Sequence, residues 1–189
     1  MNKLKIILAI ILIIAGVVGR FILVSYVGIP NLEIITALAL ISGIYLGGVY
    51  AVLVPLSIIF LSDLIIGNNY IFIFTWTAFA VIGFAGIMYR KYKTPNSKFQ
   101  ILNSFYLAIG SSIFFYLYTN FGWWLMSGMY EYSLSGLMRC YWMAIPFFRN
   151  NLIGNLIFVP MGIYVASRAF CGAKEKYYEI KKNYCGNGN

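Results

Sequence analysis

The residues that could carry chemistry are few in this chain and are unevenly spread. Among 189 residues there are five acidic residues, no histidine and three cysteines, Cys140, Cys171 and Cys185. The cysteines lack the spacing of a structural zinc site, and without histidine neither a Cys/His nor a Ser/His catalytic pair can form. No GxxxxGK[ST] phosphate-binding loop occurs. We therefore expect no catalysis by this chain, no metal and no cofactor, and any ATP hydrolysis must come from another protein.

Two of the acids, Glu33 and Asp63, are predicted to lie at one depth. Residues 32–66 are too long for one span and fit two short helices that turn near Gly47 and Gly48. Each acid lies 15 residues from that turn, which is about 22 Å along a helix. Both could simply cap helix ends at a membrane interface, which suits Glu33 better than Asp63, since Asp63 approaches a helix C-terminus. The alternative for both is a role in binding or ion pairing.

A second polar group stands in the segment "AIPFFRNN", residues 144–151, at the start of an otherwise apolar run. Asn151 and Asn155 are one helical turn apart, and Arg149 and Asn150 come just before them. Polar side chains at this position favour a site that faces the inside of a helix bundle. Arg149 could instead extend to lipid headgroups.

Aromatic residues collect in residues 120–149, which we predict to be a long outer connection. Tryptophan and tyrosine gather at membrane interfaces in any case. The same residue types, with amide and guanidinium donors, would also recognise a flat polar molecule. Our candidates in this segment are Asn120, Trp123 and Arg139.

The composition places all of these residues in a membrane. The chain is 61% hydrophobic and only 10% charged, and about 20 apolar residues suffice to span a bilayer as a helix. We predict an all-α, six-helix transmembrane bundle over residues 1–173 and a polar cytoplasmic tail over 174–189. The spans are expected at 6–23, two within 32–66, 70–89, 101–119 and 150–170. The first span could also be read as a cleaved signal peptide, but "GVVGR" is a poor cleavage site.

The distribution of charge predicts the orientation. With six spans, the N-terminus, the basic segment 90–98 and the tail share one side, which then carries the whole net charge of +9. The charges on the other side cancel: Arg20, Arg139 and Arg149 against Glu33, Asp63 and Glu131. Basic residues concentrate on the cytoplasmic side of membrane proteins. Both termini are therefore predicted to be cytoplasmic, and the polar-aromatic residues to face outward.

Small residues repeat every four positions in the first two predicted helices, at Ala15, Gly19, Ala39, Gly43 and Gly47. Such stripes allow another helix to approach closely. They could serve packing within the bundle, or they could form a docking face for another membrane subunit.

Four segments carry a family resemblance: "NLEIITALALISGIYLGG", "VPLSIIFLSDLIIG", "TNFGWWLMSGMY" and "CYWMAIPFFRNNLIGNLIF". Residues 30–160 resemble a family of small prokaryotic membrane proteins that is grouped with the substrate-binding (S) subunits of energy-coupling factor transporters. The resemblance implies a six-helix fold with a pocket open to the outside, a vitamin-like substrate, and a separate transmembrane coupling protein with two cytoplasmic ATPases. Ala15 and Gly19 would meet the coupling protein. Two positions depart from that family's pattern: the turn "LGGVY" lacks basic residues, and Asn155 replaces an acid.

We therefore expect a substrate-binding subunit of a micronutrient importer in the cell membrane of a prokaryote, in contact with lipid but not with nucleic acid. Its predicted pocket residues are Glu33, Asp63, Asn120, Trp123, Arg139, Arg149, Asn150, Asn151 and Asn155. A stand-alone channel or secondary carrier is the first alternative, and a membrane assembly subunit that transports nothing is the second.

Overall fold

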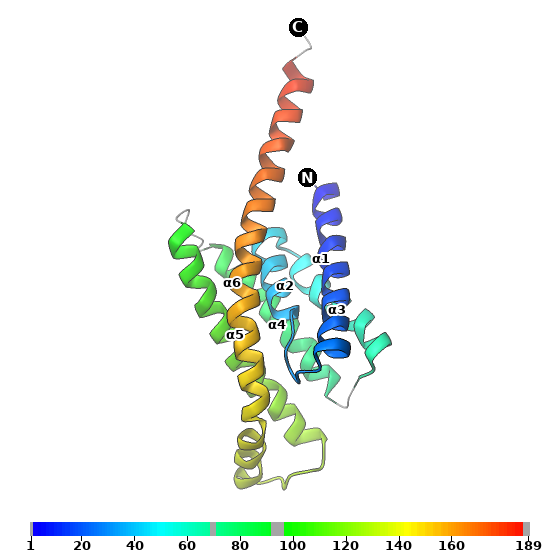
Figure 1. The fold of residues 1–189 in the computed structure, drawn as a ribbon, viewed down its shortest axis with the longest axis vertical. Helices are drawn as coiled ribbons and strands as arrows, with labels where there is room; N and C mark the ends of the chain where they lie inside the picture. Colours follow the sequence, from blue (N-terminus) through cyan, green and yellow to red (C-terminus); the bar gives the residue numbers. More distant parts are fainter. Residues whose placement is uncertain (1, 69–70, 92–96, 187–189) are drawn as a thin grey trace.

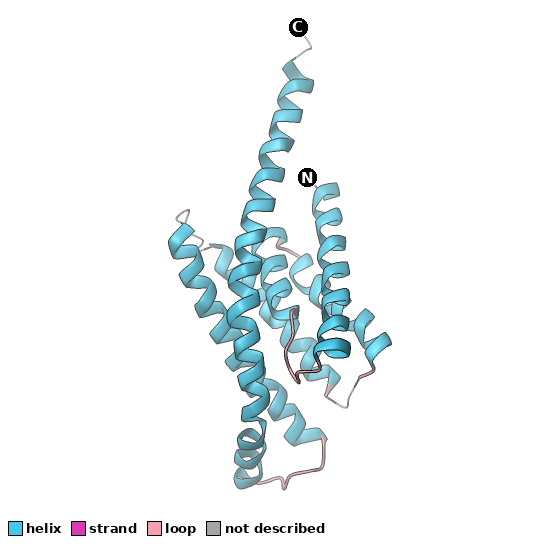
Figure 2. Ribbon diagram, viewed as in Figure 1, coloured by secondary structure: helices cyan, strands magenta, loops and turns pink. Residues whose placement is uncertain are grey.

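The computed structural model describes residues 2–68, 71–91 and 97–186, and over these ranges it contains helices and connections but no strand (Figure 2). Its elements are α1 (Asn2–Ile22), the π-helical turn η1 (Leu23–Val27), α2 (Ile35–Ile41), the π-helical turn η2 (Ser42–Leu46), α3 (Tyr50–Ile66), α4 (Phe72–Lys91), α5 (Ser97–Met126) and α6 (Leu134–Gly186). The all-α prediction is confirmed. Four segments are long and apolar enough to cross a membrane: Lys3–Val27, Phe72–Arg90, Ile101–Met126 and Leu134–Ala169.

The chain runs back and forth between two ends of the bundle. Both termini and the turn between α2 and α3 lie at one end, whereas the connections from α1 to α2 and from α5 to α6 lie at the other (Figure 1). We call these the terminal end and the far end. α6 continues beyond the bundle at the terminal end without a break at the predicted boundary between residues 173 and 174.

The predicted hairpin of two short helices is present. It turns at Gly47 and Gly48, whose φ angles of 65° and 57° are left-handed and suit glycine. α2 forms the centre of the fold, because every residue from Ile35 to Ile41 is buried. It contacts α3, α4, α5 and α6, while α1 packs on the outside against α3. A helix buried on all sides needs an apolar sequence all round, and "ITALALI" supplies it.

Glycines let η2, α3 and α4 meet at backbone distance. A methyl group on Gly43 would overlap the Gly83 carbonyl oxygen, and one on Gly83 would overlap the Ala51 carbonyl oxygen. Ala51 is four residues before Pro55, which has no N–H to donate to that carbonyl group. The close helix contacts therefore depend on positions where only glycine fits.

This packing decides where the predicted small-residue stripes lie. Ala39, Gly43 and Gly47 are buried inside the bundle, so in this structure they hold the bundle together and offer no face to another subunit. Ala15 is exposed on α1. Gly19 is partly buried, and a methyl group there would contact Ile34.

The prediction of a long connection over residues 120–149 is wrong. α5 continues to Met126 and α6 begins at Leu134, so only seven residues, 127–133, join them. The aromatic segment contains few residues that stop a helix. Gly122 lies within α5 and packs against the Phe74 ring of α4. Pro146 is accommodated within α6. Consequently Arg149 and its asparagine neighbours lie about 22 Å along α6 from its start rather than at its end. Most of the predicted loop 90–98 falls on residues 92–96, which lie outside the described residues.

Candidate ligand-binding pockets

Two pockets adjoin at the far end of the bundle. The first has a volume of about 510 Å³ and is lined mainly by residues near the ends of α1 and α3 and by the connection 28–34. α4 adds two residues, and α2, α5 and α6 add one each. The second has a volume of about 470 Å³ and lies among α4, α5 and α6. Asn31, Thr75 and Phe115 line both pockets, so one ligand could extend from the first into the second. We call them the charged pocket and the aromatic pocket.

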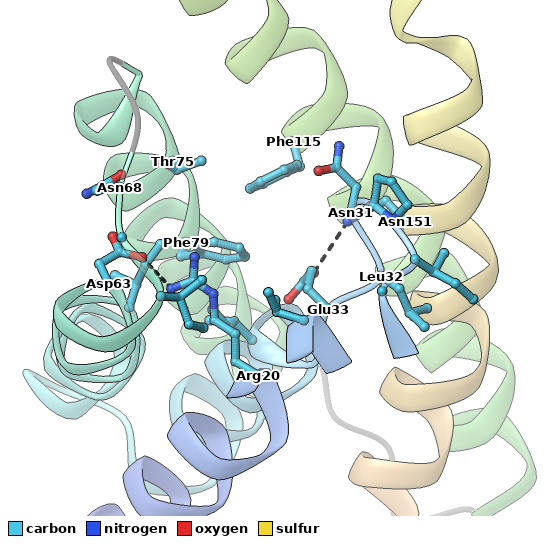
Figure 3. Close-up of a pocket in the computed structure, with 18 residues that line it drawn as sticks. Arg20, Asn31, Leu32, Glu33, Asp63, Asn68, Thr75, Phe79, Phe115 and Asn151 are labelled. Carbon is cyan, nitrogen blue, oxygen red and sulfur yellow. Dashed lines mark hydrogen bonds and ion pairs between the residues drawn. The ribbon is translucent and has the colours of Figure 1, made fainter. Parts of the chain in front are cut away.

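Arg20 and Asp63 form an ion pair on one side of the charged pocket (Figure 3), and their nitrogen and oxygen atoms are 2.5 Å apart. Arg20 also donates to the Ser62 hydroxyl, and Trp76 Nε1 donates to the second Asp63 oxygen at 3.0 Å. The Asp63 side chain is only 7% exposed. A buried carboxylate requires such partners. Of the two roles predicted for Asp63, capping a helix end or binding and ion pairing, the structure therefore shows ion pairing.

Glu33 lies across the pocket from that pair and caps α2. Its two oxygens accept hydrogen bonds from the Thr36 backbone N–H at 2.9 Å and the Thr36 hydroxyl at 2.6 Å. The Asn151 amide donates to the same carboxylate at 3.4 Å (Figure 3). Burial raises the pKa of the Glu33 carboxyl above its ordinary value, although the hydrogen bonds from Thr36 and the charge of Arg20 act in the opposite direction.

A chain of polar side chains continues from Glu33 into the bundle. The Asn155 amide donates to Asn151 Oδ1 at 3.1 Å and to the Ser112 hydroxyl at 2.9 Å. Asn151, Asn155 and Ser112 are all buried. Asn155 Oδ1 accepts no hydrogen bond. These contacts fix the side chain of Asn151, which in turn donates to Glu33 at the pocket wall.

The aromatic pocket contains polar groups but no acidic or basic side chain. It is lined by the uncharged polar residues Asn31, Thr75, Thr119 and Asn120 and by the large side chains Phe115, Trp123, Met129, Tyr130, Met143 and Phe147. Cys140 also lines it, and this thiol is free and buried. Aromatic and thioether groups with a few amides suit a flat, mainly apolar group.

The structure distributes the predicted site residues over several places. Glu33, Asp63 and Asn151 line the charged pocket, and Asn120 and Trp123 line the aromatic one. Asn155 lies behind Asn151. Asn150 donates to the Pro30 carbonyl oxygen at 3.1 Å and so anchors the connection 28–34 to α6. Arg139 and Arg149 are exposed and line neither pocket.

Several lining residues were not predicted, among them Arg20, Asn31, Asn68, Thr75 and Phe115. The sequence did contain a sign of the role of Arg20. It is the one basic residue at the far end of the first helix, and Asp63 was expected at a similar depth. Asn31 and Asn68 occupy short connections, where asparagine is common in any protein. Phe115 could not be distinguished from the apolar background. Within the described residues, no group of three Cys, Asp or Glu side chains is placed to hold a metal ion.

Comparison with known proteins identifies the family alone. The model of the family of unknown function DUF6580 matches residues 1–175, so the chain belongs to this family. No curated protein and no solved structure matches the chain. Because the family's description names no activity, the resemblance to transporter S subunits stays a prediction.

Proposed function

We propose that this member of the family is a six-span membrane protein that captures a small organic molecule at the outer face of a prokaryotic cell membrane and presents it to an energy-coupled import machinery. The observation that carries the proposal is a pocket of about 510 Å³ lined by Arg20, Glu33 and Asp63. Three ionisable groups around one cavity in so apolar a chain are costly unless they serve a function. The volumes of both pockets lie within the range of small-molecule sites.

The orientation is part of this proposal. The six helices alternate between the two ends, and the basic residues of the terminal end would lie in the cytoplasm. The pockets at the far end would then open outward. α2 and α3 are shorter than a full span, and we propose that they complete the six passes, with α2 at the buried centre of the bundle.

A stand-alone carrier would need the polar chain of Glu33, Asn151, Asn155 and Ser112 to continue to the terminal end. The next turns of α5 and α6 instead contribute Ala108, Val159 and Ile163, which are buried and apolar. This arrangement supports capture followed by transfer to a partner, namely a transmembrane coupling protein driven by cytoplasmic ATPases. Uptake of substrate into protein-containing vesicles without ATP would instead establish a carrier.

A binding screen tests the capture function. The purified chain in detergent is heated with vitamins and nucleobase-like compounds, and we expect at least one to raise its melting temperature. Thr75→Trp, which places an indole ring where both pockets meet, should abolish that shift. Thr77→Trp is the matched control, because Thr77 is exposed on α4 and lines neither pocket. If no compound stabilises the chain and no ATPase co-purifies from its native host, the proposal fails.

The orientation is tested with introduced cysteines, because the native Cys140 is buried. All three native cysteines are first changed to serine. Single cysteines are then introduced as Ser135→Cys at the start of α6 and Val49→Cys at the α2–α3 turn, and both positions are exposed. An impermeant thiol reagent should label Ser135→Cys in intact cells and Val49→Cys only after permeabilisation. The reverse pattern would place the pockets in the cytoplasm.

A further inference from the structure

The charges that line the first pocket do not balance, and the imbalance specifies a class of ligand. Arg20, Glu33 and Asp63 are its ionisable lining residues, so with Glu33 ionised the lining carries one positive and two negative formal charges. Arg20 is bound to Asp63 in a salt bridge. Glu33 forms no salt bridge, and the positive charge that acts on it is that of Arg20, which Asp63 already balances.

The hydrogen bonds of Glu33 orient its carboxyl group. The carboxylate receives two hydrogen bonds from Thr36 and a longer one, at 3.4 Å, from Asn151. The Ile35 backbone N–H also favours its ionised form. All of these donors are neutral, so they orient the carboxylate without cancelling its charge. In Figure 3, the carboxylate lies between the Arg20–Asp63 pair and Asn151, at the wall of the cavity.

The neighbouring pocket has the opposite character. Its lining contains no acidic or basic residue, and Trp123, Tyr130 and Phe115 give it aromatic walls. The shared residues Asn31 and Thr75 connect it to the charged pocket. A molecule that fills both pockets would place a cationic end beside Glu33 and an uncharged planar part between the aromatic side chains.

We propose that the ligand is an organic cation with two parts: a protonated amine or amidine that donates hydrogen bonds to Glu33, and an uncharged aromatic ring that enters the aromatic pocket. This inference rests on the proposed capture function and adds the charge and shape of the substrate. It makes Glu33 the residue that determines specificity, with Thr36 and Asn151 positioning its carboxylate.

The test uses probes that differ only in charge. Tryptamine, tryptophol and indole-3-acetate share one ring and a two-carbon tail, and the same amine, alcohol and acid series is made on phenyl and pyrimidine rings. Binding of each probe to the purified full-length chain is measured by calorimetry and by thermal shift. We expect the amine of at least one series to bind about tenfold or more tightly than its alcohol, the ratio that one charge-assisted hydrogen bond typically provides, and the acid not to bind.

Two variants assign that preference to one carboxylate. Glu33→Gln keeps an acceptor for Thr36 and should bring amine and alcohol within threefold of each other. Glu131→Gln removes one acid that is exposed and lines neither pocket, and it should retain the preference. The comparison among probes uses the unaltered chain, so the test does not depend on the folding of a variant.

The possible results separate this inference from the capture function. If a neutral or anionic compound binds in the pocket as tightly as its amine counterpart, or if Glu33→Gln leaves the preference unchanged, the charge assignment is overturned while the capture function stands. If no probe and no compound of the vitamin screen binds, both are overturned.

Discussion

The guanidinium group of Arg20 is bound to the carboxylate of Asp63 across the last turns of α1 and α3, with 2.5 Å between their nitrogen and oxygen atoms. This contact joins the outer helix of the bundle to the central hairpin at the wall of the charged pocket. It also uses the one basic group of that pocket. Glu33 consequently lines the cavity without a salt bridge of its own, and the proposed ligand chemistry follows from this.

Breaking the Arg20–Asp63 pair should destabilise the protein. Arg20→Gln or Asp63→Asn alone leaves a buried charge without its partner, which typically costs about 3–5 kcal/mol. The double variant replaces both charges by hydrogen-bonding groups of similar shape and should recover most of that loss. Thermal unfolding in detergent measures all three variants. Losses that simply add in the double variant would show that the two groups do not interact.

Binding of a cationic ligand should strengthen as the pH rises. The pKa of Glu33 lies above its ordinary value because of burial, and only the ionised carboxylate attracts an amine. Below that pKa, binding must release the proton from Glu33, so affinity should increase by up to about tenfold per pH unit and become constant above it. A probe amine stays protonated throughout, as lysine does with a pKa of about 10.4.

No other group that lines the charged pocket would produce this pH dependence of ligand affinity. The charged groups nearest in the pocket, Arg20 on α1 and Asp63 on α3, are bound to each other. The residues of α4, α5 and α6 that line the pocket are Thr75, Phe79, Phe115 and Asn151, which do not titrate. Calorimetry from pH 4 to pH 9 with an amine probe measures the effect. Glu33→Gln should give a flat profile, and a profile that keeps its slope in this variant would contradict the assignment.

Trp123→Ala should weaken ligand binding, because Trp123 is an aromatic wall of the second pocket. Loss of its stacking and buried area is worth on the order of 1–3 kcal/mol, or roughly 5- to 150-fold in affinity. Trp142→Ala is the control, since Trp142 is 73% exposed and lines neither pocket. Titration of each variant with the best ligand compares them. Equal losses in both would argue against a ring in the aromatic pocket.

Much of the helical framework was predictable from the sequence, and the site was predictable only in part. Apolar runs separated by Gly47-Gly48 predict the α2–α3 hairpin correctly, because glycine and run length determine where short helices turn. Asp63 and Asn151 were predictable because polar groups in an apolar helix are rare. The ends of α5 and α6 were not, since aromatic residues are compatible with either a helix or an interfacial connection. Nor could the sequence show that Arg149 points away from the pockets while its neighbour Asn151 lines one.

Gly83→Ala should prevent correct packing of α3 against α4. Its methyl group would overlap the Ala51 carbonyl oxygen, and overpacking that involves backbone atoms costs about 1–3 kcal/mol or more. Gly110→Ala is the matched change on α5, where nothing lies within 4 Å of the added methyl group. It should be neutral, or stabilising by up to about 1 kcal/mol through helix propensity. Yield and melting temperature in detergent distinguish the two, and similar values would contradict the close contact.

Native mass spectrometry of the chain purified from its own host tests most directly whether the two pockets hold a small molecule. We expect the unaltered protein and Thr77→Trp to carry one additional mass of the same small organic compound, and we expect Thr75→Trp to carry none. The same bound mass in Thr75→Trp, or no bound mass in any of the three, would contradict the account.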